Sequence, residues 1–371
     1  MNKIAFITGS RSEVGALKGV IEEIDKRSFC DYCIIMHGAH NLEFFGNTSD
    51  ELKMHFASKI FFENTISEIT EDKKELFVNS ISKLYSILKK EKVNYVYIIG
   101  DRIEAYAAAL AAHLLNLIIF HYGGGNISNG SNDNIYRYNI TNLAHVHLAT
   151  SLFAFKRLKA LPIITKEKVY FVGSSAVDSI ITFLEQPVAI GNYIPELSNR
   201  SFVLMTFHPD LDTNKRTIQI MDFIIHCVIK KEKSLLITYP NHDVGFQDII
   251  DVIEKWKHHE LVHVVKHLGK IRYYSAVYSS QFVIGNTSSG FVEVPYFSKV
   301  FYNIGSRQDG RDGDDFIMNL GYDKKLIAHE LNTLEYVKKM KGKNNTKVYG
   351  NGDAASKIID IIKNEMQSKQ I

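Results

Sequence analysis

One stretch of the chain, Ile98–Arg137, restricts the fold more than any other part of the sequence. The apolar run Tyr95–Ile99 predicts a buried strand, an alanine-rich helix follows, and Leu117–His121 predicts a second strand. A strand, a helix and a strand in this order form a βαβ unit with parallel strands. Ligands of open parallel sheets bind beyond the carboxyl ends of the strands. Asp101 and Asp133, which follow the two strands, are therefore candidates for a substrate site.

The rest of the chain alternates between predicted strands and helices in the same way, and its length of 371 residues favours two domains. A first alternation covers residues 1–185, and a second begins at Phe202–Thr206 and covers residues 200–350. Between them, Glu185–Arg200 holds two of the six prolines and has no clear period, which is typical of a linker. The predicted fold class is α/β, with two Rossmann-like domains facing a cleft.

Composition and charge exclude several kinds of protein. The 44 basic and 41 acidic residues leave a net charge of +3, which is too small to indicate nucleic-acid binding. No run approaches the roughly 18 apolar residues of a membrane-spanning helix, and the N-terminus lacks a secretory signal. Cys30 and Cys33 form a C-x-x-C motif just before an apolar run, so we expect strand residues rather than a redox site. We predict a cytoplasmic protein with neither nucleic-acid nor membrane partners.

The N-terminal segment combines a strand with a glycine turn. Lys3–Thr8 predicts a buried strand, and Gly9–Gly15 predicts a tight turn into a helix. The turn contains neither the G-x-G-x-x-G pattern of dinucleotide-binding proteins nor the G-K-[ST] ending of a Walker loop. A helix N-terminus after a strand and a glycine nonetheless favours an anion, and Arg11 adds a positive charge there.

Polar residues also follow three predicted strands of the second domain. The segments are Thr206–Asp210, Tyr239–Asp243 and Gly285–Gly290, which contain His208, Asn241, Thr287, Ser288 and Ser289. The third segment suits a phosphate, because small residues expose backbone N–H groups and hydroxyls at a helix start. Glu293 lies about one turn further and could accept hydrogen bonds from ribose hydroxyls. Arg307 and Arg311 follow near a glycine loop.

Each of these motifs also has a purely structural explanation, which is the simpler one when a motif is taken alone. Asp101 could cap a helix, and His208 could be a histidine whose hydrogen bonds are all satisfied. Arg307 and Arg311 could pair with the neighbouring aspartates. Taken together, the motifs favour a site, because those of both halves fall at the carboxyl ends of predicted strands.

Fifteen histidines raise the question of a metal centre. The two groups with suitable ligands are His259, His263 and His267, and Cys30, Cys33, His37 and His40. Both groups overlap predicted strands, and an extended strand spreads its side chains too far apart to surround one ion. We therefore predict no metal at either place.

The order of the motifs resembles the hydrolysing UDP-N-acetylglucosamine 2-epimerases of bacterial sialic acid biosynthesis. It is also similar to their relatives that act on nucleotide-linked diacetamido-trideoxy sugars in legionaminic acid pathways. In the first half the matching segments are Thr8–Arg11, Gly100–Glu104, Gly124-Gly125, Asp133–Arg137 and Val172–Ser174. In the second half they are Thr206–Pro209, Tyr239–Asn241, Gly285–Gly290, Glu293 and Asn303–Arg311. The resemblance thus covers nearly the whole chain.

The resemblance implies a glycosyltransferase-B-like fold, with UDP held mainly by the second domain and residues 351–371 forming a helix that returns to the first. Asp101 and Asp133 would be the acid/base carboxylates, and His208 would stabilise the leaving diphosphate. Arg11 would touch the diphosphate, and Arg137 would orient carboxylates or phosphate. The other residues implied to bind substrate or UDP are Asn241, Thr287, Ser288, Ser289, Gly290, Glu293, Arg307 and Arg311. The family requires no metal or nicotinamide cofactor, and its members are homodimers or tetramers.

The family eliminates UDP by removing the proton at carbon 2 of the sugar, and water then adds to the resulting glycal. Its members usually read H-x-E-A-G or H-x-H-G-G-E where this chain reads His121–Asn126, so Gly123 and Asn126 replace expected glutamates. We expect a hydrolysing 2-epimerase of a UDP-N-acetylamino sugar. The alternatives are a UDP-sugar hydrolase without epimerisation, a glycosyltransferase on the same fold, and a nucleotide-sugar binding protein without catalysis.

Overall fold

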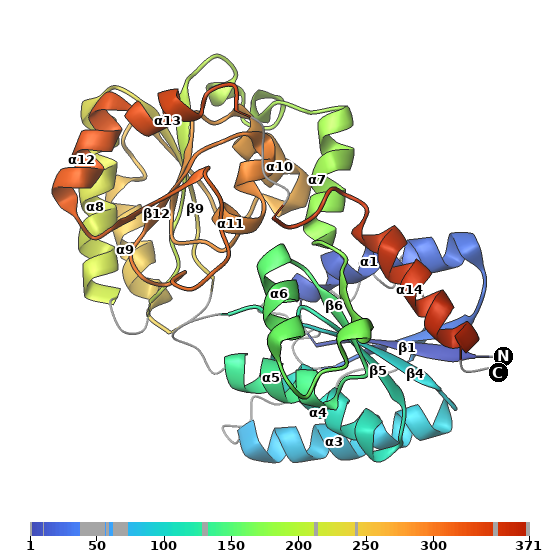
Figure 1. Cartoon of the computed structure of the whole chain (residues 1–371). Coiled ribbons are helices and arrows are strands. Elements are labelled where there is room, and N and C mark those ends of the chain that lie inside the picture. The colour runs from blue at the N-terminus through green and yellow to red at the C-terminus, as the bar shows by residue number, and fades with distance from the viewer. Residues whose placement is uncertain are drawn as a thin grey trace. The chain divides into compact units, whose positions relative to one another are not determined.

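A computed structural model describes residues 2–9, 11–37, 56, 59–61, 73–127, 133–210, 214–241, 244–343 and 348–368. The chain divides into two compact units, which Figure 1 shows as ribbons. The first unit comprises Met1–Ile127, Ser131–Asp178 and Tyr349–Ile371. The second unit comprises Ser128–Gly130 and Ser179–Val348.

The first unit is built on a parallel sheet. Within the described ranges the sheet has seven strands in the order β3-β2-β1-β4-β5-β6-β7. The strands are β1 (Lys3–Thr8), β2 (Asp31–Met36), β3 (Ile60–Phe61), β4 (Tyr95–Ile99), β5 (Ile118–Tyr122), β6 (Val146–Ala149) and β7 (Val169–Phe171). Most of their side chains are buried, because helices cover both faces of the sheet. The continuous apolar runs in the sequence thus correctly predicted β1, β2, β4 and β5.

Two layers of helices enclose this sheet (Figure 1). One face packs on α1 (Arg11–Arg27) and α14 (Ala354–Ser368), and the other packs on α3 (Lys73–Lys90), α4 (Ile103–Leu114) and α5 (Asp133–Leu143). Helix α1 buries Val14, Leu17, Ile21 and Ile24, whose spacing of three and four residues places them on one side of the helix. The remaining helices are α6 (Leu152–Ala160) and α7 (Ser175–Glu185), and the boundary between the two units falls inside α7.

The second unit repeats this arrangement. Its described residues form a six-stranded parallel sheet in the order β10-β9-β8-β11-β12-β13. The strands are β8 (Phe202–Thr206), β9 (Ser234–Thr238), β10 (Val262–Val265), β11 (Val283–Gly285), β12 (Phe301–Ile304) and β13 (Ile317–Gly321). The helices are α8 (Asn214–Lys230), α9 (Phe246–Trp256), α10 (Gly269–Ser279), α11 (Ser289–Val292), α12 (Lys324–Thr333) and α13 (Glu335–Met340). Two Rossmann-like sheets with helices on them confirm the predicted α/β fold class.

In both sheets the chain first adds strands on one side of a central strand and then on the other side. This reversal of strand order determines where a ligand can bind. In the first sheet, β1 is flanked by β2 and β4, and in the second sheet β8 is flanked by β9 and β11. Successive connections leave such a central strand on opposite sides, which opens a crevice beyond its carboxyl end. Asp101 follows β4 at this point of the first sheet, and His208 follows β8 at the corresponding point of the second sheet.

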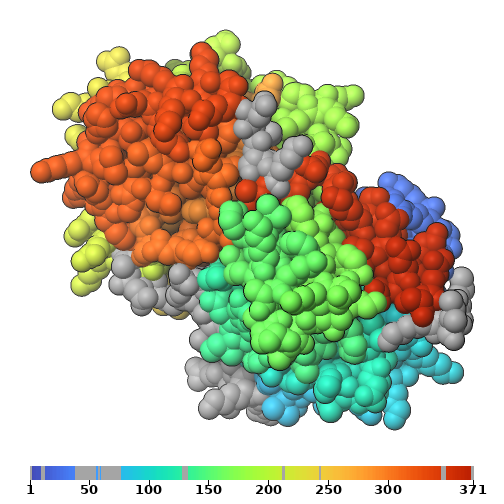
Figure 2. All heavy atoms as spheres, in the orientation of Figure 1, coloured from blue at the N-terminus to red at the C-terminus, as the bar shows by residue number. Residues whose placement is uncertain are grey.

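The C-terminal helix α14 completes the first unit. Figure 2 shows it on the surface beside α1, and Ile358, Ile359 and Ile362 are buried in the first core. Arg27 of α1 forms an ion pair with Asp360 and donates a hydrogen bond to Ser356 Oγ at 2.7 Å. Helix α14 therefore packs in the same hydrophobic core as the N-terminal elements β1 and α1. None of the described helices is long and apolar enough to cross a lipid bilayer.

Some elements differ from the sequence-based expectations. The turn predicted over Gly9–Gly15 is shorter, because α1 begins at Arg11. The sequence pattern did not reveal α6, β13, α12 or α13. Strand β13 exposes Met318 and Asn319 in part, so it lacks the continuous apolar run that marked the other strands. Short helices such as α13 bury too few side chains to impose a period on the sequence.

Candidate active site

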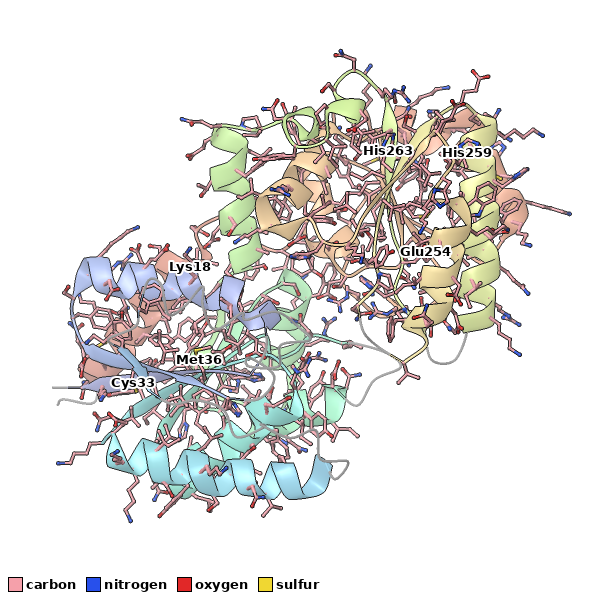
Figure 3. The ribbon with its side chains drawn as sticks, turned by 180° about the vertical axis from the view of Figure 1, so that it is seen from behind. Lys18, Cys33, Met36, Glu254, His259 and His263 are labelled. Carbon is pink, nitrogen blue, oxygen red and sulfur yellow. The ribbon has the colours of Figure 1, made fainter. Side chains whose placement is uncertain are left out.

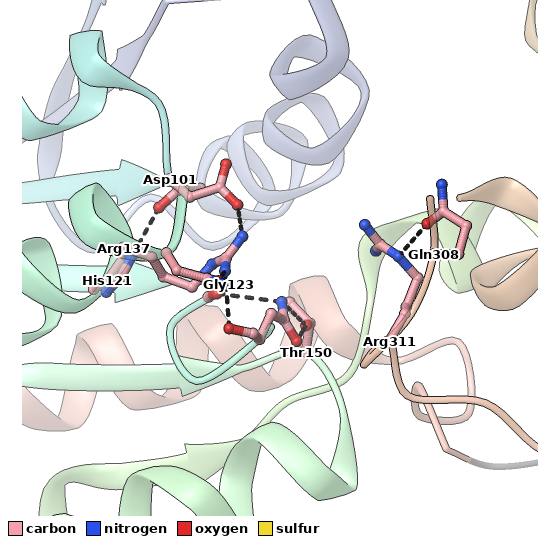
Figure 4. Close-up of polar contacts among 10 residues, drawn as sticks. Asp101, His121, Gly123, Arg137, Thr150, Gln308 and Arg311 are labelled. Atoms are coloured by element: carbon pink, nitrogen blue, oxygen red, sulfur yellow. Dashed lines mark hydrogen bonds and ion pairs between the residues drawn. The ribbon is translucent and has the colours of Figure 1, made fainter. Parts of the chain in front are cut away.

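Asp101 lies at the carboxyl end of β4, where it forms an ion pair with Arg137 of α5 (Figure 4). The Arg137 side chain is 2% exposed, whereas Asp101 keeps 28% of its side-chain surface accessible. Arg137 also donates to the carbonyl oxygen of Asn126 at 2.9 Å and to the side-chain oxygen of Asn134. A buried cation therefore holds a partly exposed carboxylate in one orientation. Such a group can act as a general base on a bound substrate.

The loop Gly123-Gly124-Gly125 follows β5 and is shaped by a buried histidine below it. His121 Nε2 lies 2.9 Å from the carbonyl oxygen of Gly100, and its Nδ1 lies 3.2 Å from Thr141 Oγ1. Because a carbonyl only accepts, Nε2 carries the proton and Nδ1 accepts from the hydroxyl. A side chain at Gly124 would place its Cβ 3.0 Å from His121 Nδ1 and 3.1 Å from Thr141 Oγ1, so a larger residue there would press on both side chains.

Burial determines the charge of this histidine. Burial and, to a smaller extent, the nearby Arg137 cation lower the pKa of His121 to about 4, although the hydrogen bond that the imidazole donates to the Gly100 carbonyl favours the protonated form. Burial likewise lowers the pKa of its neighbour His147 on β6 to about 3. Both imidazoles are thus neutral at physiological pH. His121 supports the loop, and neither histidine carries a proton that it could donate as an imidazolium.

Asp133 is the first residue of α5 and lies near Arg102. The Arg102 guanidinium donates to Glu104 at 3.3 Å. Burial opposes its charge, but Glu104, Glu13 and Asp133 outweigh this effect and raise the pKa of Arg102. The carboxyl edge of the first sheet therefore carries several carboxylates around one cation, in addition to the Asp101–Arg137 pair.

The turn between β1 and α1 is closed by its own carboxylate. Glu13 accepts hydrogen bonds from the Gly9 N–H at 2.7 Å and from Thr8 Oγ1 at 3.1 Å, and it is buried. The Gly9 amide is therefore occupied by an internal anion, and an external anion would have to use other groups. Arg11 begins the helix, but its side chain lies outside the described residues. Its contact with a diphosphate stays a prediction.

His208 follows β8 in the second unit and is held by Asn286, which follows β11. The Asn286 side chain accepts from the His208 N–H at 2.7 Å and donates to the His208 carbonyl at 2.9 Å. The Asn241 N–H donates to His208 Nδ1 at 3.1 Å. With Nδ1 accepting, a neutral imidazole carries its proton on Nε2. This is the atom that can donate to the oxygen of a leaving group.

The loop after β12 contributes Arg307, Gln308 and Arg311. Arg307 donates to the carbonyl oxygens of Pro209 at 3.2 Å and Asn286 at 3.3 Å. The buried Gln308 donates to the Asn286 carbonyl at 2.9 Å and accepts from Arg311 Nε at 2.7 Å (Figure 4). Within the described residues Arg311 forms no ion pair, so the rest of its guanidinium can serve an anion.

Three hydroxyl residues follow Asn286 as the sequence suggested. Ser289 Oγ lies 2.6 Å from the Tyr273 hydroxyl and 3.1 Å from Thr287 Oγ1, while Ser288 is exposed. Helix α11 has only four residues, and the Gly290 N–H already bonds to the Thr287 carbonyl. The hydroxyls are therefore better placed than the helix end to bind phosphate. Gly290 is required by packing, since a Cβ would lie 2.2 Å from the Phe301 ring.

Glu293 lies one turn beyond these hydroxyls. Burial raises its pKa to about 7, and Lys270 offsets this only in part. Its negative charge raises the pKa values of Tyr273 and Tyr274, to which burial contributes most. No described residue donates a hydrogen bond to its carboxylate, so Glu293 can accept from a ligand.

The residues weighed as metal ligands do not converge on one point in the described parts of the chain. Figure 3 shows His259 and His263 in the second unit and Cys33 on the first sheet. His259 Nδ1 accepts from the Leu261 N–H at 3.3 Å, and His263 belongs to β10. Cys30 and Cys33 are free and buried, and burial raises the pKa of Cys30 to about 11. His40 lies outside the described residues.

Several supporting residues escaped the sequence reasoning. Asn286 and Gln308 lie inside motifs that the sequence singled out, yet their own contacts could not be foreseen. Glu13 and Thr150 lie at strand and helix ends without a recognisable pattern. Only the glycines next to His121 could have suggested a close approach of a side chain to the loop.

The whole chain has known relatives. Residues 22–363 match the family model described as UDP-N-acetylglucosamine 2-epimerase. A Legionella pneumophila protein named UDP-N,N'-diacetylbacillosamine 2-epimerase (hydrolyzing) is 25% identical to this chain. The match covers 98% of this chain and 96% of the Legionella protein. A Campylobacter jejuni protein named GDP/UDP-N,N'-diacetylbacillosamine 2-epimerase (hydrolyzing) is 28% identical over 83% of this chain and 82% of its own.

Solved structures share the fold. The structure of UDP-GlcNAc 2-epimerase from Neisseria meningitidis bound to UDP-GlcNAc superposes with a TM-score of 0.82. The match covers 97% of this chain and 99% of that chain, at 19% sequence identity. The S. aureus MnaA-UDP co-structure gives a TM-score of 0.80, at 19% identity and over 99% and 97% of the two chains. These likenesses confirm the predicted glycosyltransferase-B-like fold.

Proposed function

The chain belongs to the UDP-N-acetylglucosamine 2-epimerase family of enzymes, and on this premise we propose that it is a hydrolysing 2-epimerase of a UDP-N-acetylamino sugar. The substrate is UDP-N-acetylglucosamine, yielding N-acetylmannosamine and UDP, or its 2,4-diacetamido-trideoxy analogue. The names of the Legionella and Campylobacter relatives support both the hydrolysing reaction and the diacetamido sugar. A cytoplasmic location and a homo-oligomeric state remain predictions.

The observation that carries the proposal is the Asp101 carboxylate, held by buried Arg137 at the carboxyl end of β4. In the proposed reaction, Asp101 removes the proton from carbon 2 while the bond between carbon 1 and the diphosphate oxygen breaks. The electron pair of the C–H bond forms the double bond of a glycal, and UDP departs with the pair of the broken bond. A carboxylate held in one orientation suits this step, which needs a positioned group to take the proton from carbon 2.

Groups of the second unit then stabilise the charge that develops on the leaving diphosphate. His208 donates from Nε2, and Arg311 and the hydroxyls of Thr287, Ser288 and Ser289 add further hydrogen bonds. Asn241 keeps His208 in the donating form through its N–H. Glu293 accepts from the ribose hydroxyls.

The second half of the reaction restores the sugar. Water adds its oxygen to carbon 1 of the glycal, and carbon 2 receives a proton on the face opposite to the one that lost it. Asp133, at the start of α5, supplies that proton in our proposal. The proton that the attacking water loses passes through solvent and restores Asp133, and the proton that Asp101 took is returned to solvent, so the products are the free 2-epimer and UDP.

A second candidate follows from one specific observation. Gly123 and Asn126 occupy positions at which the family usually has glutamate, and neither can transfer a proton. A UDP-sugar hydrolase that leaves carbon 2 untouched, or a glycosyltransferase, would not need that carboxylate. A binding protein without catalysis would need neither Asp101 nor Asp133.

Proton NMR of the reaction in deuterated water separates these possibilities. We expect free N-acetylmannosamine, or the diacetamido equivalent, with deuterium at carbon 2 and with UDP released. Free sugar that keeps its carbon-2 proton would establish simple hydrolysis and refute the epimerase. Absence of reaction with both UDP-sugars, in a protein that binds UDP, would favour the binding protein.

A further inference from the structure

The loop Gly123–Asn126 is fixed by hydrogen bonds to its own carbonyl groups. The Gly123 carbonyl accepts from Asn126 Nδ2 at 3.2 Å, and the Gly125 carbonyl accepts from Arg157 Nε at 2.6 Å. The Asn126 carbonyl accepts from Arg137 Nη1 at 2.9 Å. A glycine-rich loop would otherwise have many conformations, so these side chains determine which one it adopts.

Thr150 holds the side chain of Asn126 from the neighbouring strand. It follows β6, is 8% exposed, and lies with Oγ1 3.0 Å from Asn126 Nδ2 and 3.4 Å from Asn126 Oδ1. The Asn126 amide is therefore clamped between Thr150 and the Gly123 carbonyl. Figure 4 shows Thr150, Gly123 and Arg137 together at this edge of the sheet.

The same loop determines where Arg137 can place its guanidinium. Arg137 is buried, and it divides its donors between the Asn126 carbonyl, the Asn134 side chain and Asp101. A shift of the Asn126 backbone would draw the guanidinium with it, and the Asp101 carboxylate would follow its ion-pair partner. A displacement of about 1 Å at a reacting group can cost on the order of 100-fold in rate.

We propose that Asn126 and Thr150 are positioning residues for the Asp101 carboxylate, acting through the loop and Arg137. The inference rests on the proposed function of Asp101 as the base. The Asn126 amide would then serve the reaction by fixing the loop that holds Arg137 and, through it, the Asp101 base. Related enzymes carry a glutamate at this position. An aspartate there would place a carboxylate oxygen against the Gly123 carbonyl, where the amide now donates.

The test uses conservative variants of the whole chain. Thr150→Val removes the hydroxyl and keeps the shape, Asn126→Asp removes the donor, and Thr150→Ser keeps the hydroxyl. Thr165→Val is the matched control, because Thr165 is an exposed threonine of the same unit whose side chain caps no helix. Each variant is assayed for kcat, KM, UDP affinity and the fraction folded at the assay temperature.

We expect Thr150→Val and Asn126→Asp to lower kcat about 10-fold per folded molecule, as loss of one or two hydrogen bonds in the network implies. KM and UDP affinity should remain within about twofold of wild type, because neither Asn126 nor Thr150 is among the groups proposed to bind UDP. Thr150→Ser should regain most of the rate, and Thr165→Val should match wild type. A fall in kcat that only follows the loss of folded protein would overturn the proposal, as would an unchanged kcat.

A crystal structure of Thr150→Val decides the inference without any assay. We expect the Asn126 carbonyl to shift and the Arg137–Asp101 ion pair to lengthen or break. An ion pair that stays in place would refute the positioning role, whatever the substrate. If instead the wild-type enzyme turned over neither UDP-sugar, the proposed function would fail, and the crystal structure would still decide what places Asp101.

Discussion

The Asp101 carboxylate shows how a surface-accessible group can be given a fixed direction by a buried one. Arg137 has almost no exposed surface, and it orients Asp101 while leaving part of that carboxylate open. We predict that Asp101→Asn lowers turnover by at least about 10²-fold, because an amide cannot take a proton. UDP affinity, measured by calorimetry, should be nearly unchanged. Wild-type turnover in this variant would show that another residue is the base.

The Glu293 carboxylate gives UDP binding a pH dependence of its own. Its pKa of about 7 means that it becomes protonated as the pH falls through neutrality. The ionised form accepts hydrogen bonds from ribose hydroxyls at both carboxylate oxygens, whereas protonation turns one oxygen into a donor, so UDP affinity should fall by up to about tenfold per pH unit below pH 7. Calorimetric titrations between pH 8 and 5.5 measure this. Glu293→Gln, which cannot ionise, is the comparison, since it retains only the pH dependence of UDP itself.

At the scale of the elements, the loop after β5 depends on glycine for its conformation. Gly125 has a φ of +76°, and a Cβ there would lie 2.6 Å from the Ala154 carbonyl oxygen. We predict that Gly125→Ala costs roughly 2–5 kcal/mol of unfolding free energy through strain and overpacking. Gly15→Ala in α1 is the matched control, since its Cβ would meet no atom within 4 Å. It should stabilise the helix by about 0.5–1 kcal/mol. Urea denaturation measures both, and equal effects would contradict this account.

Strands β5 and β6 carry the neutral histidines 121 and 147, which make the first unit sensitive to acid. Their pKa values of about 4 and about 3 in the folded protein lie below the ordinary value of 6.5. Between the folded-state pKa and pH 6.5, the unfolded chain therefore binds more protons than the folded protein. Stability is therefore full above pH 6.5 and is lost as the pH falls, by about 2 kcal/mol per histidine between pH 7.5 and 5.

Urea titrations at the two pH values test this with His147→Gln and the exposed His113→Gln. His147→Gln should lose one histidine's share of the pH dependence, because glutamine stays neutral throughout. His113→Gln should leave the dependence as in wild type. A pH dependence that both variants retain in full would assign the acid sensitivity to other groups.

For the molecule as a whole, the final helix connects the two ends of the sequence. Ile362 of α14 is fully buried in the first core, whereas Lys363 beside it is exposed. We predict that Ile362→Ala lowers the stability of the first unit by about 2–5 kcal/mol, and that Lys363→Ala has little effect. Calorimetry should show the transition of the first unit moving to lower temperature while that of the second stays in place. A joint shift of both transitions would mean that the two units unfold together.

Sequence patterns determined the class of this fold and the places of its candidate site. Strands buried on both faces appear as continuous apolar runs, and parallel strands put the residues that follow them on one edge, so Asp101 and His208 could be located without a structure. The order of motifs along the chain likewise indicated the family. The sequence pattern did not predict the edge strand β13 and the short helices, because partly buried elements show no strong period of apolar residues.

Tertiary structure alone decided which side chains support these groups. Thr150 and Asn126 are 24 residues apart, and His208 and Asn286 are 78 apart, so no local pattern links them. Their partnership follows from strand order, which places β6 beside β5 and β11 beside β8. Burial likewise sets the charge of His121 and the pKa of Glu293, because desolvation depends on all the atoms that surround a group. Local sequence encodes the period of each element, while these interactions exist only once distant elements have packed.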